Sequence, residues 1–104
     1  MFVIVWQFDV QLNHVTEFEE QYSATGAWAK LFSKSNQFLR TRLLKEAGMS
    51  RRYVTFDLWK SEDAFQEFAA EFAQEYKDLN AKTARLTISE TRLGSFTTDA
   101  ANIF

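Results

Sequence analysis

The stretch Trp59-Lys-Ser-Glu-Asp-Ala-Phe65 joins the end of a predicted strand to the beginning of a predicted helix. Ser61 is of a type that caps helix N-termini, and Glu62 and Asp63 put negative charge into the first turn, where the helix dipole favours it. The pattern predicts a helix that starts at residue 61. This helix either continues into residues 81–86 or breaks there. Large apolar side chains recur along one stripe of it, at helical spacing: Phe65, Phe68, Phe72, Tyr76 and Leu79.

Extended segments rich in β-branched and aromatic residues flank this helix in the chain. Residues 52–59 form the strand before it, and residues 38–45 pair with that strand antiparallel across a turn in which Gly48 can take positive φ. Residues 2–10 form the first strand, and residues 87–93 form the last.

A helical region connects the first two strands. Asn13 can cap its first helix, and Gly26 interrupts the pattern before a further helical stretch over residues 27–34. One face of the first helix carries Val15, Phe18 and Tyr22.

The resulting order is β-α-β-β-α-β, which predicts an α+β, ferredoxin-like fold with a four-stranded antiparallel sheet and helices on one face. We expect one domain over residues 1–104, with residues 93–104 forming a C-terminal tail anchored by Phe96 and Phe104. The other sheet face has no cover and carries large apolar groups. We therefore expect a homodimer in which two sheets pack against each other.

The alternation of residues along the strands predicts which side chains the helices cover. Matching the apolar positions of the strands places four side chains on the face toward the helices: Ile4, Trp6, Phe56 and Leu58. The same matching places Gln7 and Trp59 on the face away from the helices. Charged residues of the later strands then share a mixed face: Arg40, Arg42, Asp57, Glu90 and Arg92. Paired charges among them would set the register across the dimer, or one of the arginines would supply an oxyanion contact.

Composition excludes several classes of function. The 104 residues contain no Cys and one His, His14, so disulfides, thiol chemistry and a multi-His metal site within one chain are excluded. The net charge of −2 gives no basic footprint for nucleic acid. No apolar run is long enough to span a bilayer, and the N-terminus does not resemble a signal peptide, so we expect a cytoplasmic protein.

Aromatic residues make up 16% of the chain, more than one small core obviously needs, which indicates a cavity lined by aromatic rings or a subunit interface.

The strand that ends in Trp59, followed by a Ser cap, acidic residues and Ala-Phe, resembles the antibiotic biosynthesis monooxygenase superfamily, and the likeness covers nearly all of residues 2–96. The resemblance implies a dimeric α/β barrel with a pocket between sheet and helices in each subunit. It also implies cofactor-free oxidation of phenols or enols, in which a substrate carbanion passes an electron directly to O₂.

Candidate site residues follow from this resemblance and from the residue pattern. The catalytic candidates are Trp59, Tyr76 and Gln7, and the resemblance turns Gln7 and Trp59 toward the helix-side pocket, against the alternation described above. Each has a plainer explanation: a packing anchor for Trp59, a half-buried amphipathic residue for Tyr76, and a contact across the dimer axis for Gln7. The candidate pocket residues are Trp6, Trp28, Phe32, Phe68 and Phe72.

The leading expectation is a cofactor-independent monooxygenase that oxidises a small planar aromatic or polyketide-like substrate with O₂, without metal or flavin. One alternative is a non-catalytic homodimeric protein that binds a hydrophobic metabolite, and a lyase or isomerase is another. A haem-degrading oxygenase is a further alternative, although the second helix offers Tyr76 where such relatives have a His ligand, and His14 lies in a different helix.

Overall fold

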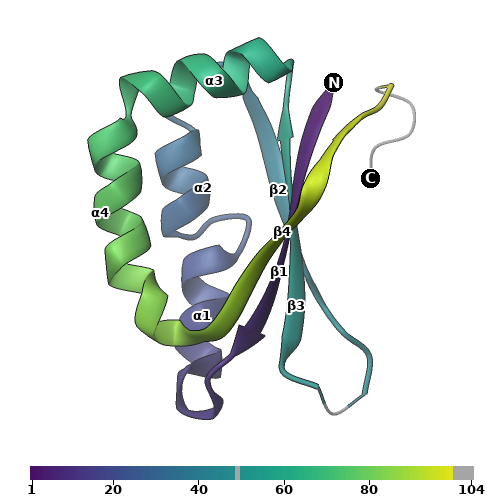
Figure 1. The fold of residues 1–104 in the computed structure, drawn as a ribbon, viewed down its shortest axis with the longest axis vertical. Coiled ribbons are helices and arrows are strands. Elements are labelled where there is room, and N and C mark those ends of the chain that lie inside the picture. Colours follow the sequence, from purple (N-terminus) through teal and green to yellow (C-terminus); the bar gives the residue numbers. More distant parts are fainter. Residues whose placement is uncertain (49, 100–104) are drawn as a thin grey trace.

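The computed structural model describes residues 1–48 and 50–99, and its four strands form one antiparallel sheet in the order β2-β3-β1-β4. The strands are β1 (Phe2–Val10), β2 (Phe38–Lys45), β3 (Arg52–Trp59) and β4 (Thr87–Thr97). The helices α1 (Val15–Tyr22), α2 (Ala27–Phe32), α3 (Glu62–Glu71) and α4 (Ala73–Thr83) lie on one side of the sheet, as Figure 1 shows. Two short 3₁₀ turns complete the chain order, η1 (Leu12–His14) and η2 (Ala84–Leu86). The predicted α+β ferredoxin-like fold is confirmed.

One of the two helix caps predicted from the sequence is present in the structure, and the other is not. Ser61 caps α3, because its Oγ accepts a hydrogen bond from the backbone N–H of Ala64 at 3.0 Å. The helical region after it breaks at Phe72, earlier than expected, and continues as α4. The predicted cap at Asn13 is wrong: Asn13 lies inside η1, and α1 follows His14 without a side-chain cap.

Glycines are required at two positions for different reasons. A Cβ on Gly26, which precedes α2, would lie 2.3 Å from the carbonyl oxygen of Glu20 and 2.5 Å from that of Gln21. The end of α1 and the start of α2 can therefore approach this closely only because Gly26 has no side chain. Gly48 takes a φ of +100° in the turn between β2 and β3, as the sequence predicts.

The hydrophobic core lies between the helices and one face of the sheet. From β1 it contains Phe2, Ile4, Phe8 and Val10, so the predicted orientation of the even positions is confirmed. For β3 the prediction is wrong. Tyr53 and Trp59 enter this core, and the alternation of a strand sends Phe56 and Leu58 to the opposite face.

The physical reason is the pairing of β3 with β1. Trp59 stands opposite Phe2 and Tyr53 opposite Phe8, so the odd positions of β3 share a face with the even positions of β1. Burying Tyr53 and Trp59 under the helices outweighs placing Phe56 there, and Leu58 is buried on the opposite face as well, with 3% of the residue exposed.

The five charged residues predicted to share one face are divided between both faces. Arg40 pairs with Leu58 and Arg42 with Phe56, which places both arginines on the face away from the helices. The pairing Ile4–Asp57, Phe8–Glu90 and Trp6–Arg92 puts the other three on the helix side.

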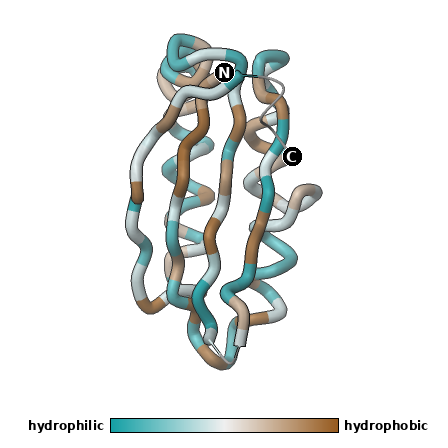
Figure 2. Tube along the Cα trace, turned by 90° about the vertical axis from the view of Figure 1, so that its right-hand side faces the viewer, coloured by the Kyte–Doolittle hydropathy of each residue, from teal (hydrophilic) through white to brown (hydrophobic). Residues whose placement is uncertain are grey.

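Figure 2 shows the sheet face that no helix covers, with hydrophobic segments along its strands. We call this the open face. Exposed apolar side chains at its edges include Leu44 on β2 and Phe96 on β4. Strand β4 runs to Thr97, beyond the predicted end at residue 93, so Phe96 belongs to the sheet. Phe104, the other predicted anchor, lies outside the described residues. No helix in the described ranges is long and apolar enough to cross a membrane.

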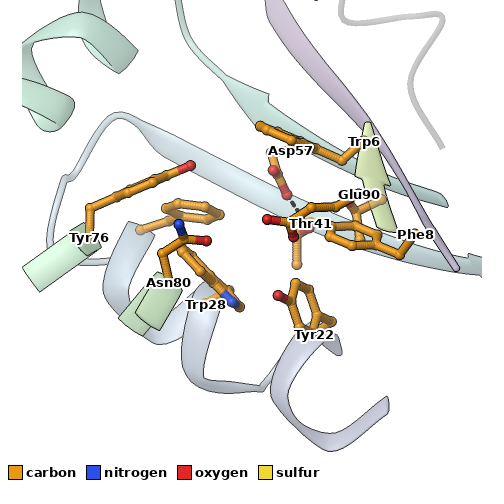
Figure 3. A pocket seen from close by; sticks show the side chains of 11 residues that line it. Trp6, Phe8, Tyr22, Trp28, Thr41, Asp57, Tyr76, Asn80 and Glu90 are labelled. Atoms are coloured by element: carbon orange, nitrogen blue, oxygen red, sulfur yellow. Dashed lines mark hydrogen bonds between the residues drawn. The ribbon is translucent and has the colours of Figure 1, made fainter. Parts of the chain in front are cut away.

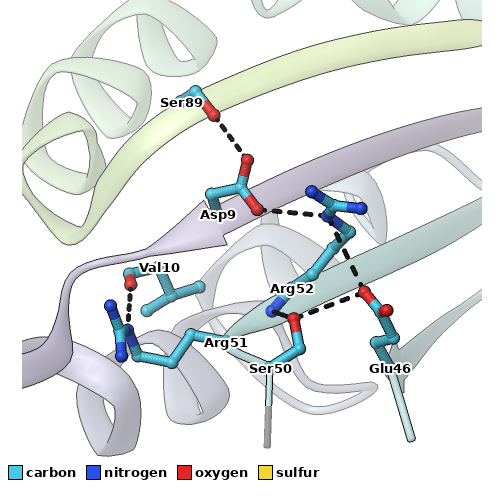
Figure 4. A network of polar contacts seen from close by, with 7 residues as sticks. All are labelled: Asp9, Val10, Glu46, Ser50, Arg51, Arg52 and Ser89. Carbon is cyan, nitrogen blue, oxygen red and sulfur yellow. Dashed lines mark hydrogen bonds and ion pairs between the residues drawn. The ribbon is translucent and has the colours of Figure 1, made fainter.

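A polar network ties β1 to both of its neighbours near the β2–β3 turn (Figure 4). The Asp9 carboxylate accepts hydrogen bonds from Ser89 Oγ at 2.9 Å and from Arg52 Nε at 3.2 Å. The hydrogen bond from Ser89, followed by that from Arg52, holds the pKa of Asp9 below its usual value. Arg51 Nε adds a hydrogen bond to the Val10 carbonyl at 3.1 Å.

Candidate active site

A pocket lies between the helix-side face of the sheet and the helices, and it contains about 440 Å³ of empty space, part of it open to solvent. All four strands contribute to its sheet wall, which consists of Trp6, Phe8, Thr41, Thr55, Asp57 and Glu90. Three helices contribute the opposite wall, which consists of Tyr22, Trp28, Phe32, Tyr76 and Asn80. Figure 3 shows these side chains extending into the space between the two layers.

Asp57 is the buried carboxyl group of this pocket, with 8% of the residue exposed. Thr41 Oγ1, on the neighbouring strand β2, donates a hydrogen bond of 2.5 Å to Asp57 Oδ1 (Figure 3). That length is typical of a hydroxyl that donates to an ionised carboxylate. The register of the hairpin explains the contact, because Thr41 and Asp57 stand directly opposite each other on β2 and β3.

Burial changes the acidity of Asp57. Removal from water disfavours the carboxylate and raises the pKa of Asp57 to about 6, while the hydrogen bond from Thr41 acts in the opposite direction. The group is therefore mostly ionised at neutral pH, yet it is a much stronger base than an exposed aspartate.

The helix wall brings two phenol groups to the pocket. Burial raises the pKa of Tyr76, and the nearby Asp57 charge raises it further, so its hydroxyl remains protonated. The Tyr76 ring packs edge-on against Trp28 with ring centroids 5.0 Å apart. Burial also raises the pKa of Tyr22 to about 12. Both phenols are therefore hydrogen-bond donors at neutral pH.

The rim and the walls carry acidic and neutral polar groups. Asn80 and Glu90 are exposed at the rim, and desolvation raises the pKa of Glu90. The described lining residues include neither Lys, Arg nor His. The indole N–H of Trp28 is buried near the Tyr22 hydroxyl, whose pKa it lowers, but it makes no hydrogen bond of normal geometry among the described residues. It is therefore a donor that a ligand oxygen can use.

Trp59 belongs to a separate aromatic cluster and does not line the pocket. It is fully buried, and its ring centroid lies 5.0 Å from that of Phe68 and 5.6 Å from that of Phe32. Phe72 packs on Phe68 at 5.3 Å. Phe32 is the residue shared with the pocket. Trp59 thus lies on the helix side of the sheet, as the family resemblance implied.

Gln7 lies on the open face, where it pairs with Val54 and Thr91. The structure therefore brings together four of the residues selected from the sequence: Trp6, Trp28, Phe32 and Tyr76. It does not bring the other four into the pocket: Gln7, Trp59, Phe68 and Phe72. The catalytic roles of Trp59, Tyr76 and Gln7 stay predictions.

Sequence reasoning missed Asp57 as a pocket residue and assigned it to a dimer contact. One signal was available, because Asp57 stands two positions before Trp59 and so shares its strand face. A carboxyl group on the same strand face as a large apolar Trp is expected to be buried, and buried carboxyl groups are rare outside functional sites. Thr41, Asn80 and Tyr22 come from three other elements, and no sequence pattern connects them.

The described residues contain no group of three or more His, Cys, Asp or Glu that could hold a metal ion. His14 lies in η1 and is not part of the pocket lining.

Solved structures match this fold, whereas no protein-family model and no curated protein matches the chain. SnoaB, a cofactor-independent oxygenase from Streptomyces nogalater, is 27% identical to this chain; the match covers 94% of this chain and 92% of SnoaB, with a TM-score of 0.69. A protein from Nitrosomonas europaea assigned to the antibiotic biosynthesis monooxygenases is 14% identical, with a TM-score of 0.68 and coverage of 94% and 98%. One from Deinococcus radiodurans is 10% identical, with a TM-score of 0.69 and coverage of 100% and 99%. The last two likenesses bear on the fold alone.

Proposed function

Because the chain belongs to the antibiotic biosynthesis monooxygenase superfamily, we propose that it oxidises a small planar aromatic or polyketide-like molecule with O₂, without metal or flavin. The observation that carries this proposal is the pocket of aromatic rings between the sheet and the helices. The likeness to SnoaB, a cofactor-independent oxygenase, extends over nearly the whole chain and supports it.

The pocket walls suit a flat, largely apolar ligand. Trp6 and Phe8 are stacked on the sheet side, with ring centroids 6.3 Å apart. Trp28 and Phe32 face them from α2, with ring centroids 5.8 Å apart. Ring faces and edges favour offset stacking with an aromatic ligand, and burial of apolar surface supplies the affinity.

The proposed reaction converts a substrate CH₂ group and O₂ into a carbonyl group and water. The substrate first loses a proton and becomes a carbanion, delocalised onto its oxygens. One electron then passes to O₂, and the substrate radical combines with superoxide to form a carbon–oxygen bond. The peroxide is protonated and loses water, which leaves the carbonyl group.

Two groups on the helix wall are suited to hold the substrate oxygen on which the negative charge collects. Tyr76 supplies a protonated phenol hydroxyl, and Trp28 supplies a buried indole N–H, near the Tyr22 hydroxyl, that makes no hydrogen bond of normal geometry among the described residues. Donors that are held in place before the reaction stabilise a developing oxyanion without reorganisation.

The direct test measures O₂ consumption by the purified, metal-free and flavin-free protein with dithranol, a hydroxylated anthrone. We expect one O₂ consumed per quinone formed, at a rate well above that of buffer. Consumption no faster than in buffer, for dithranol and for related anthrones, would contradict the proposal.

The same experiment distinguishes the alternative functions. Tight binding of these ligands without turnover would favour a non-catalytic protein that binds a hydrophobic metabolite. A Soret band on addition of haem, followed by its decay with a reductant, would favour a haem-degrading oxygenase.

We also infer that the protein is a homodimer in which two open faces pack together. The support is the apolar character of this face, with Val3 and Phe56 half-buried at its centre by strand register and Phe96 exposed on β4. A sheet face of this composition is favourable to cover and costly to leave in water.

A further inference from the structure

We propose that Asp57 is the group that accepts the proton from the substrate before O₂ reacts. The inference rests on the proposed function and deepens it, since oxidation of this kind begins with the loss of a proton. It is carried by the position of one buried carboxylate in the wall of an aromatic pocket.

The geometry leaves one carboxylate oxygen available. Thr41 Oγ1 holds Oδ1 of Asp57 at 2.5 Å. Oδ2 accepts no hydrogen bond from any residue that the structure describes, and Asp57 lines the pocket. Anchoring one oxygen fixes the direction of the other, which is what a general base needs in order to meet a bound substrate.

The plainer explanation, a structural ion pair, does not fit. Asp57 forms no salt bridge within the described ranges, and no cation lines the pocket beside it. A buried carboxylate with one hydrogen bond is costly to the fold, because desolvation of its charge is only partly compensated. Such uncompensated groups are concentrated at functional sites.

The groups around Asp57 leave it ionised and able to act as a base. Thr41 of β2 donates to it, and the pocket lining also includes Tyr76 of α4 and Glu90 of β4. Arg92 lies two positions after Glu90 on the same face of β4, outside the lining. Tyr22 of α1 completes the ionisable groups of the lining. Burial raises the pKa of Asp57 to about 6, which is close to the value that suits proton transfer near neutral pH.

The step balances as a single proton transfer. The carbon–hydrogen bond of the acidic CH₂ group breaks, its electron pair stays on the substrate, and the proton forms a bond to Oδ2. The total charge of the pocket is unchanged, because the negative charge moves from Asp57 to the substrate. The same proton can later return to the peroxide, which restores the carboxylate for the next turnover.

Anaerobic deuterium exchange tests this step separately from oxidation. Without O₂, dithranol cannot be oxidised, so deuterium that enters its CH₂ group from D₂O reports the loss and return of a proton at that carbon. NMR distinguishes it from exchange at the hydroxyl groups. We expect wild-type protein to accelerate exchange over buffer, with a rate that rises with pH and levels off above about pH 6, where Asp57 is ionised.

Two variants and a control are matched to the geometry. Asp57→Asn keeps the shape of the side chain but removes the base, and we expect at least about a 100-fold loss of exchange. Thr41→Val keeps the base but removes its donor, so exchange persists while the pH midpoint moves upward. Asp63→Asn, in the first turn of α3, removes a carboxyl group outside the pocket and leaves exchange unchanged.

The outcomes separate the two proposals. Exchange by Asp57→Asn within about threefold of wild type, with a native circular dichroism spectrum, overturns the role of Asp57 even if dithranol is oxidised. A Thr41→Val midpoint that does not move also contradicts it. Exchange that depends on Asp57 without O₂ consumption supports the role of Asp57 and overturns the oxygenase proposal. Absence of both exchange and oxidation in the wild type overturns both.

Discussion

Asp57 is a carboxyl group that the fold keeps from water, and its ionisation is linked to stability. Its pKa in the folded protein is about 6, above the ordinary value of 3.8, so the folded state binds this proton more tightly than the unfolded state. The ionised group therefore lowers the free energy of unfolding. The penalty is small near pH 4, grows as pH rises from about 4 to 6, and is complete above that range.

We predict that Asp57→Asn raises the free energy of unfolding on the order of 2–3 kcal/mol at about pH 8, and changes it little at about pH 4. Urea denaturation at the two pH values measures the difference. Asp63→Asn is the control and should show no such dependence. An equal effect of Asp57→Asn at both pH values would mean that the group is not desolvated as the structure has it.

The Tyr76 hydroxyl is the second single group whose removal is informative. We predict that Tyr76→Phe lowers turnover of dithranol about tenfold, since a lost hydrogen bond of about 1.4 kcal/mol corresponds to that factor. The ring contact with Trp28 is retained, so the melting temperature should change little.

The matched control is Tyr53→Phe. The Tyr53 hydroxyl donates to Glu19 Oε2 at 2.5 Å and lies outside the pocket lining, so its loss should affect stability and not turnover. Equal turnover by Tyr76→Phe and wild type would show that the Tyr76 hydroxyl takes no part in the mechanism. Tyr76 would then contribute to the pocket only through the packing of its ring.

At the scale of elements, the approach of α2 to α1 positions the helix wall of the pocket. We predict that Gly26→Ala destabilises the protein by about 1–3 kcal/mol, because its Cβ would collide with backbone oxygens of Glu20 and Gln21 that cannot move alone. The shift of α2 also displaces Trp28 and Phe32, so ligand affinity should fall as well. Denaturation and ligand titration measure the two effects.

Gly48→Ala separates this steric effect from general loss of stability. A Cβ at Gly48 meets nothing within 4 Å, but its φ of +100° is strained for an L side chain. We expect a cost of about 1–2 kcal/mol with unchanged ligand affinity. If Gly26→Ala likewise left affinity unchanged, the helix contact would not control the pocket.

At the scale of the whole molecule, one layer of helices covers one face of a sheet that is apolar on both. We predict that wild type sediments as a dimer at micromolar concentration and that Phe96→Glu shifts it toward the monomer by at least about tenfold in dissociation constant, because a charge would be buried at the interface. Phe96 is 55% exposed on the open face.

Leu12→Glu is the control for this prediction. Leu12 is 68% exposed, but it lies in η1, away from the sheet. Dissociation by both variants, or a wild-type protein that stays monomeric, would show that the open face is not the contact surface.

Local patterns in the chain were sufficient for the element order, the α3 cap at Ser61, the turn at Gly48 and the inward face of β1. Each depends on residues within a few positions of one another, where helix periodicity, strand alternation and turn chemistry act directly. The aromatic pocket wall of α2 and the place of Tyr76 on the helical stripe follow from the same local information.

Only the tertiary structure decided which face of β3 lies under the helices, because a shift of one residue in pairing exchanges the two faces and both carry large apolar groups. That choice put Trp59 into a packed cluster and Asp57 into the pocket, and it sent Phe56 to the open face, where Gln7 of β1 already lies. The pocket combines side chains from seven elements, so its acidity and shape arise from contacts between segments far apart in the chain.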